Sequence, residues 1–257
     1  MRPRIILVVI LSLLFADICL AQTTHHKKKP TKPPARIKVA EGSYAFYTRT
    51  GEVLTTFEEP WALTKTPVGF ELSEQWRSNQ SADSQQGPMA VEFNVMFTTN
   101  MQPLTVHIGN KDSKTGITCS LSLTDFTCIG ADKSSSVPVQ SPYNFFLPSP
   151  WMMSAIARRS KKELGGFTDV RMVYLDGMTA DGPKLESFSA QVIYKGQEQF
   201  TAAGRIFTAD KFEIINPGSF PDMKIWVNPE GITLAMEDSS KADQRMVLTT
   251  YKQYVKF

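Results

Sequence analysis

Residues that could act as acids, bases or metal ligands are few in this 257-residue chain. His107 is the single histidine outside the adjacent pair His25-His26, so a Ser-His-Asp triad would depend on one imidazole, and most histidine-based metal sites are excluded. His107 falls in the polar phase of an alternating segment, and we expect it to face solvent. The pair His25-His26 could bind a metal ion, but its surroundings predict no preformed pocket.

Two groups of carboxylates lie close enough in sequence to be considered for acid–base chemistry. Glu58 and Glu59 are adjacent, which on a strand sends their side chains to opposite faces. Asp176 and Asp181 lie beside turn glycines, and no H-E-x-x-H, G-x-S-x-G or phosphate-binding glycine loop is present. We therefore expect no catalytic residue, no cofactor and no metal site. The alternative is a hydrolase of polysaccharide or cell wall that depends on Asp176, Asp181 or His107.

Two cysteines, Cys119 and Cys128, lie outside the N-terminal segment. An even number of cysteines predicts a disulfide if the chain is exported to an oxidising compartment. If the flanking segments pair as a hairpin in which Cys119 faces Cys128, then Leu121 faces Phe126 on the same apolar face. A redox-active pair usually has two intervening residues, whereas eight separate these cysteines. We predict a structural disulfide that contributes about 2–3 kcal/mol.

Bulky apolar side chains are the positive signal for binding. They exceed what a thin, one-sided sheet requires, and a curved sheet that closes over a helix can leave an apolar cavity for a lipid or small molecule. Methionines suit such a cavity because their side chains adapt to irregular ligands. Ordinary core filling is the alternative at each position. The candidates for lining the cavity are Trp61, Phe70, Trp76, Phe93, Phe97, Trp151, Met152, Met153, Ile156, Met172 and Tyr174.

Alternation of apolar and polar residues predicts that the chain is built mainly of strands with one buried face. The clearest segments are 91–97, 104–108, 117–123 and 188–194. Turn signals such as Asn228-Pro229-Glu230-Gly231 separate the strands at short intervals. Many short strands with tight connections predict a mainly β fold, an antiparallel and strongly curved open barrel.

One segment, residues 149–164, breaks the alternation and predicts a helix. Ser149 suits the N-cap, Pro150 suits the first helical position, and Gly165 suits the C-terminal stop. Met152 and Ile156 are four residues apart, which gives the first half of the helix an apolar face. We expect this helix to pack against the concave side of the sheet.

The first 21 residues have the pattern of a signal peptide. Two arginines precede an apolar run, Ile5–Phe15, that is shorter than the about 20 residues needed to cross a bilayer as a helix. Small residues precede a cleavage site between Ala21 and Gln22. The alternatives are an uncleaved anchor and lipid attachment at Cys19, for which the preceding isoleucine fits poorly. We expect a periplasmic or extracellular protein without an integral membrane span.

Residues 22–41 are predicted to form a basic, Pro/Lys-rich disordered tether ahead of a single β domain at 42–257. The signal peptide carries +1 and Gln22–Lys38 carries +6 of the total charge of +3, which leaves −4 for Val39–Phe257. A folded part with this charge does not suggest a nucleic-acid surface. The tether is either a solvated spacer or a segment that adheres to anionic envelope surfaces.

The stretch from Met223 to Leu234 is similar to a strand–turn–strand pattern, W-x-x-P-x-G-x-P-x-R, matched here at Trp226, Pro229 and Gly231. On this stretch and its layout the chain resembles a bacterial periplasmic domain-of-unknown-function family related to the lipoprotein-carrier open β-barrels. Thr233 and Ala235 depart from the pattern, where proline and a basic residue are typical. The resemblance implies an open barrel wrapped around a helix, with an apolar interior, and it supplies no catalytic residues to carry over.

Together these features predict an exported, non-enzymatic protein that holds a lipid or other apolar ligand within a curved sheet, in envelope lipid or lipoprotein handling. One alternative is a structural or interaction module of the cell envelope that has a filled core and docks through a sheet edge. The polysaccharide or cell-wall hydrolase is the other. The space beside Met152 and Met153 distinguishes the first two, because a filled interior favours the module.

Overall fold

The computed structural model describes residues 35–48, 50–78, 90–110, 116–122, 124–130, 133–146, 149–179, 182–218, 220–240 and 244–256. The predicted signal peptide, the cleavage site at Ala21 and Gln22 and most of the predicted tether lie outside these residues. The first described strand begins at Ile37, ahead of the predicted domain boundary at residue 42.

The described residues of the unit that follows residue 34 form fifteen strands and one helix. The helix is α2 (Pro150–Arg159). The strands are β1 (Ile37–Thr48), β2 (Val53–Thr66), β3 (Gly69–Ser78), β4 (Ala90–Phe97), β5 (Pro103–Asn110), β6 (Gly116–Ser122), β7 (Asp125–Gly130), β8 (Lys133–Pro138), β9 (Tyr143–Phe146), β10 (Phe167–Thr179), β11 (Gly182–Ala202), β12 (Arg205–Ile215), β13 (Met223–Val227), β14 (Thr233–Asp238) and β15 (Gln244–Gln253).

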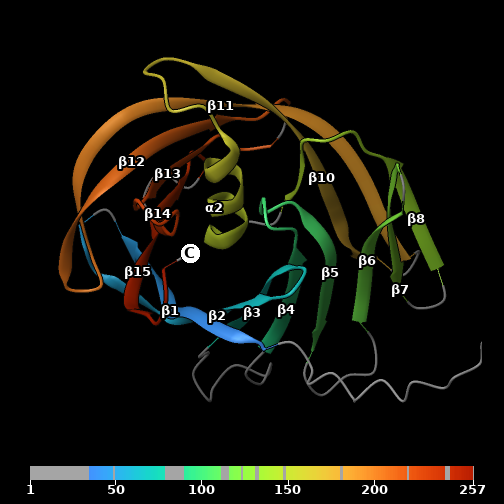
Figure 1. Ribbon diagram of the computed structural model, residues 1–257, viewed down its shortest axis with the longest axis horizontal. Coiled ribbons are helices and arrows are strands. Elements are labelled where there is room, and N and C mark those ends of the chain that lie inside the picture. Colours follow the sequence, from blue (N-terminus) through green and yellow to red (C-terminus); the bar gives the residue numbers. More distant parts are fainter. Residues whose placement is uncertain are drawn as a thin grey trace, which may run out of the picture. The chain divides into compact units, whose positions relative to one another are not determined.

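All the strands belong to one sheet built from two meanders. One meander runs from β8 back to β1, the other runs from β15 back to β10, and the pairing of β1 with β15 joins them in the middle. Neighbouring strands are antiparallel except β9 and β10, which are parallel. The sheet curves strongly without closing through hydrogen bonds, and helix α2 lies on its concave side (Figure 1). The predicted mainly β half-barrel with one internal helix is confirmed.

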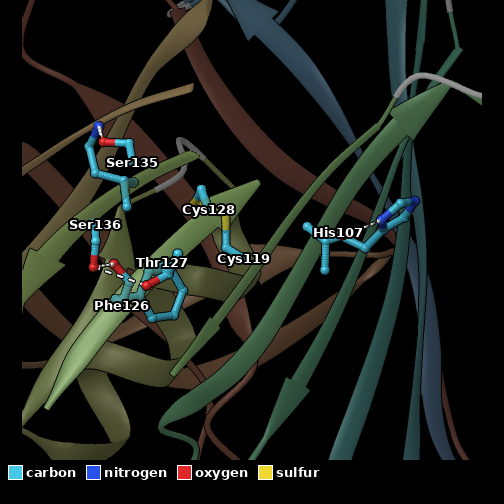
Figure 2. Close-up of a disulfide and its surroundings, with 9 residues drawn as sticks. His107, Cys119, Phe126, Thr127, Cys128, Ser135 and Ser136 are labelled. Carbon is cyan, nitrogen blue, oxygen red and sulfur yellow. Dashed lines mark hydrogen bonds between the residues drawn. A yellow bond between two sulfur atoms is a disulfide. The ribbon is translucent and has the colours of Figure 1, made fainter. Parts of the chain in front are cut away.

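Alternation along the strands places the core as the sequence predicts. On β4, Phe93, Val95 and Phe97 are buried, while the residues between them are only partly covered. β6 and β7 pair in the predicted register, with Cys119 opposite Cys128, and the two cysteines form a fully buried disulfide (Figure 2). The predicted hairpin and its disulfide are therefore confirmed.

Helix α2 begins as predicted and ends earlier. Ser149 is the N-cap, and its Oγ accepts a hydrogen bond from the backbone N–H of Trp151 at 3.2 Å. The predicted end near residue 164 is wrong, because Ser160 takes an extended conformation and its Oγ donates to the Ile156 carbonyl at 2.9 Å. Gly165 donates its N–H to the Tyr194 carbonyl on β11 and so belongs to the turn before β10.

Within the described residues, no helix has the length and apolar character needed to cross a bilayer.

Candidate functional site

The concave interior around helix α2 contains the residues predicted to line a cavity. Nine of the eleven are buried in the core, and the other two, Trp76 and Tyr174, pack partly buried against it. Trp151, Met153 and Ile156 on the helix have exposed fractions of 0%. The space beside the helix in this conformation is therefore lined and occupied by the chain's own side chains, and the predicted role in ligand binding stays a prediction.

Ring contacts place the aromatic candidates in separate groups, one of which is Trp76 with Phe93, whose ring centroids are 4.6 Å apart. Beside the start of the helix, Trp61 on β2 meets Trp151 edge-on with ring centroids 4.9 Å apart. Tyr174 on β10 belongs to a separate cluster, in which its ring lies 4.9 Å from that of Phe220. The structure therefore brings Trp61 and Trp151 together and places Tyr174 elsewhere.

Several cavities border this interior, among them one of about 240 Å³ beside Ala157 and Arg158 at the end of the helix. An apolar cavity of about 60 Å³ is lined by Phe46, Met223, Met236 and Met246, none of which the sequence singled out. A wider depression of about 400 Å³ over β1, β2 and β15 reaches Trp61. The apolar cavity is smaller than the several hundred Å³ of a typical ligand pocket, so it does not suit a lipid in this conformation.

Two glutamates face the interior beneath the start of helix α2. Glu59 and Glu74 have exposed fractions of 0% and 1%. Glu59 shares the inward phase of β2 with Trp61, and Glu74 follows the buried Leu72 on β3. Because Trp61 pairs directly with Glu74, Glu59 lies diagonally across from Glu74 on the same face, within reach of a long side chain. We call Glu59 and Glu74 the glutamate pair.

The hydrogen bonds of the glutamate pair are unequal. Ser149 Oγ donates to Glu74 Oε2 at 2.8 Å, and Trp76 Nε1 donates to Glu74 Oε1 at 3.0 Å. Both oxygens of Glu59 are buried and accept no hydrogen bond. Glu74 thus has the environment of a carboxylate, whereas Glu59 has that of a neutral carboxyl group.

The surroundings change the acidity of both groups in the same direction. Burial raises the pKa of Glu59 well above its ordinary value, and the neighbouring charge of Glu74 raises it further. Burial also raises the pKa of Glu74, although the hydrogen bonds from Ser149 and Trp76 oppose that rise. Two buried carboxyl groups with raised pKa values hold protons better than they do in water.

Further polar contacts anchor the helix to the sheet. Ser154 Oγ lies 2.7 Å from Thr233 Oγ1 on β14, and the Thr233 backbone N–H donates to Ser154 Oγ at 2.8 Å. Thr233 Oγ1 also donates to the Pro150 carbonyl at 2.8 Å. Asn144 on β9 donates from Nδ2 to the Met152 carbonyl at 2.9 Å. Side chains from two sides of the barrel therefore hold the helix in place.

The C-terminal end of the helix has charge of the opposite sign. Arg159 donates from a guanidinium N–H to the Tyr143 carbonyl at 2.7 Å, and Arg158 Nε donates to the Gly231 carbonyl at 3.3 Å. Burial lowers the pKa of each guanidinium to about 10. Negative charge at the start of the helix and positive charge at its end both complement the helix dipole.

The other predicted candidates for chemistry lie outside this interior. His107 is exposed on β5, its Nδ1 lies 3.1 Å from Thr118 Oγ1, and it points away from the disulfide (Figure 2). Glu58 is exposed while Glu59 is buried, so the prediction that these neighbours face opposite ways is confirmed. The side chains of Asp176 and Asp181 lie outside the described residues. Across the part of the chain that the structure describes, no group of three or more His, Cys, Asp or Glu residues could hold a metal ion.

Sequence reasoning considered Glu59 and missed Glu74. The sequence contained a pattern that could have identified Glu74. In the alternation along β3, Glu74 falls on the same face as the apolar residues Phe70 and Leu72. An acidic residue at an inward position of a strand is buried or interrupts the strand, and either outcome marks it for attention.

Comparison with known proteins gives no family. No family model and no curated protein matches the chain. Among solved structures, a DUF1089 family protein from Pseudomonas aeruginosa is 14% identical over 68% of this chain and 87% of its own, with a TM-score of 0.43. A putative lipoprotein from Parabacteroides distasonis is 9% identical over 86% of this chain and 97% of its own, with a TM-score of 0.35.

A third structure, a putative exported protein with a YmcC-like fold from Bacteroides fragilis, is 11% identical over 86% of this chain and 98% of its own, with a TM-score of 0.33. Similarity at this level of identity and TM-score carries no conclusion about what the present chain binds or does.

Proposed function

We propose that this chain is an exported, non-enzymatic β-sheet module with a filled core, which works outside the reducing cytoplasm by binding a partner. The observation that carries this proposal is the burial of Trp151, Met152 and Met153, at 0%, 1% and 0% exposure, in the place where a ligand would lie. A carrier with an open cavity needs space there, and the helix takes that space.

Export is supported by two independent features. The N-terminal sequence has the basic start, the short apolar run and the small residues of a signal peptide. The disulfide between Cys119 and Cys128 suits an oxidising compartment, where such bonds persist. The lysine-rich segment that follows the signal peptide would favour anionic surfaces of the cell envelope.

The absence of catalysis is supported by the position of the ionisable groups. The glutamate pair resembles an acid–base dyad in its chemistry, but both carboxyl groups are covered by the helix and the sheet. His107 is exposed on the outer side of β5, apart from that pair. A substrate would have to displace helix α2 before it reached either glutamate.

Binding of an apolar ligand is the second candidate function, with helix α2 as a plug. Its specific support is that side chains of Glu74, Thr233 and Asn144 hold the helix. Among the described residues, no backbone–backbone hydrogen bond joins the helix to a strand. If the helix moved out, Trp61 and the residues around it would present an apolar surface to a lipid. Handling of envelope lipids or lipoproteins is the setting that this function would fit.

One experiment separates the two candidates. The chain from Gln22 onward is purified from an oxidising compartment, extracted with organic solvent and analysed by mass spectrometry, and a delipidated sample is titrated with a fluorescent fatty acid. The filled module predicts no bound amphiphile and no saturable uptake. A stoichiometric amphiphile, or saturable uptake by the delipidated protein, would overturn the module and establish the carrier.

A further inference from the structure

The glutamate pair lies where three elements meet. Glu59 comes from β2, Glu74 comes from β3, and Ser149 at the N-cap of helix α2 donates its hydroxyl to Glu74. The same hydroxyl oxygen accepts the backbone N–H of Trp151. Ser149 therefore links the carboxyl group of Glu74 to the first turn of the helix through two hydrogen bonds.

The environment of the pair provides little to balance negative charge. From β1, Tyr44 is the titratable group that faces the pair, and its hydroxyl donates to the Thr233 carbonyl at 2.9 Å. Tyr251 on β15 lies beyond it, and β4 contributes the apolar Phe93. Throughout the described chain, no lysine, arginine or histidine is hydrogen-bonded to or ion-paired with Glu59 or Glu74.

The positive end of the helix dipole is then the main stabilising charge beside the pair. It amounts to roughly half an elementary charge. Two ionised carboxylates buried together would each lack their hydration, and their mutual repulsion would add to that cost. One negative charge is compatible with this environment, and a second is not.

Hydrogen bonding indicates which group carries the negative charge. Glu74 accepts from Ser149 and Trp76, so both of its oxygens are used as acceptors. Glu59 accepts nothing, and a proton on its carboxyl group gives it a hydrogen bond to donate to Glu74. This unequal hydrogen bonding suits two neighbouring carboxyl groups that share one proton.

We propose that Glu59 and Glu74 form a binding site for a single proton that locks the N-terminal turn of helix α2 inside the sheet, and that loss of this proton releases the helix. The lock is a property of the chain alone. It does not depend on whether the protein acts as a module or as a ligand carrier.

The direction of the pH dependence follows from proton counting. The folded pair keeps a proton at a pH where both carboxyl groups of the unfolded chain have lost theirs, because its pKa values are raised. The folded state therefore binds one more proton, and stability falls as pH rises. The folding equilibrium constant should decrease about tenfold per pH unit from above the ordinary glutamate pKa until the pair ionises fully.

The test compares Glu59→Gln with Glu58→Gln. Glu58 is the matched control, because it is adjacent to Glu59 in the sequence and its carboxylate is exposed on the opposite face of the strand. Urea unfolding at a series of pH values, starting above the ordinary glutamate pKa and rising until the dependence levels off, gives the folding equilibrium constant of each. Over the range in which the folded pair keeps its proton, the folding equilibrium constant of the wild type and of Glu58→Gln should fall about tenfold per pH unit, and that of Glu59→Gln should fall less because its amide is always neutral. Equal pH dependence in all three proteins would overturn the proposal.

Two measurements on the wild type keep the test decisive if Glu59→Gln does not fold. Carbon-13 NMR of labelled glutamates should show one carboxyl group that stays protonated at a pH where the exposed glutamates have lost their protons, and its absence would refute the shared proton. Hydrogen exchange, corrected for the intrinsic effect of pH, should show that amides 151–157 lose protection with rising pH before those of β11 and β12. Simultaneous loss in all three elements would refute release of the helix.

Discussion

The side chains of Ser149 and Glu74 lie 75 residues apart in the sequence and are joined by a 2.8 Å hydrogen bond inside the barrel. Ser149 is also the N-cap, so one hydroxyl group serves the start of helix α2 and the buried carboxylate on β3. The helix is therefore fixed to the sheet by a polar contact at the point where its dipole favours negative charge.

Replacement of Ser149 by alanine should lower the free energy of unfolding by about 1–3 kcal/mol, because it removes both the cap and a donor to a buried carboxylate. Urea unfolding measures the change. Ser134→Ala, at an exposed position on β8, is the control and should alter stability by less than about 0.5 kcal/mol. Equal stability of the two variants would mean that the contact contributes nothing.

Met153→Ala should destabilise the protein by about 2–5 kcal/mol, since a fully buried side chain is removed from a packed interior. The variant should also bind a small apolar probe that the wild type excludes, measurable by fluorescence or by xenon NMR. Leu164→Ala is the matched control, because the Leu164 side chain is 75% exposed. Uptake of the probe by the wild type itself would contradict the filled interior.

Reduction of the disulfide should lower stability by about 2–3 kcal/mol, the entropic effect of opening a short loop. Thermal unfolding with and without dithiothreitol measures the effect. A Cys119→Ala, Cys128→Ala double variant should unfold at one temperature under both conditions. If the unfolding temperature of that variant changed with dithiothreitol, the reagent would be acting on something other than the disulfide.

Thr233→Val should lower the free energy of unfolding by about 1–3 kcal/mol, because it removes the hydroxyl that donates to the Pro150 carbonyl and contacts Ser154. The loss from Thr233→Val combined with Ser154→Ala should be smaller than the sum of the single losses, since the two groups share one contact. A double-mutant cycle in urea gives this coupling. Strict additivity would show that the two side chains act independently.

The fold could be predicted from the sequence to the extent that it depends on local patterns. Alternation placed Phe93, Val95 and Phe97 inward, and the spacing of Cys119 and Cys128 gave their register. The pairing of β1 with β15 could not be predicted, because it joins segments about two hundred residues apart and no local pattern marks it.

The candidate site was predictable only in its apolar part. Trp61, Trp151 and Met153 belong to the interior that their bulk suggested. Glu59 was dismissed together with its exposed neighbour Glu58, and Glu74 was missed, because only the tertiary structure shows that two inward acidic residues meet under one helix end. The end of the helix was also missed, since the competing hydrogen bond from Ser160 is not visible in propensities.

The pairing of β1 with β15 has a consequence for assembly. β1 pairs with β2 along one edge, and its other edge is paired only by β15. The two meanders therefore stay separate until β15 is present. Closing so long a loop is entropically unfavourable and makes such pairing a late event. Until then β1 has one unpaired edge in the middle of the future sheet, where it is open to chaperones or to another copy of the chain.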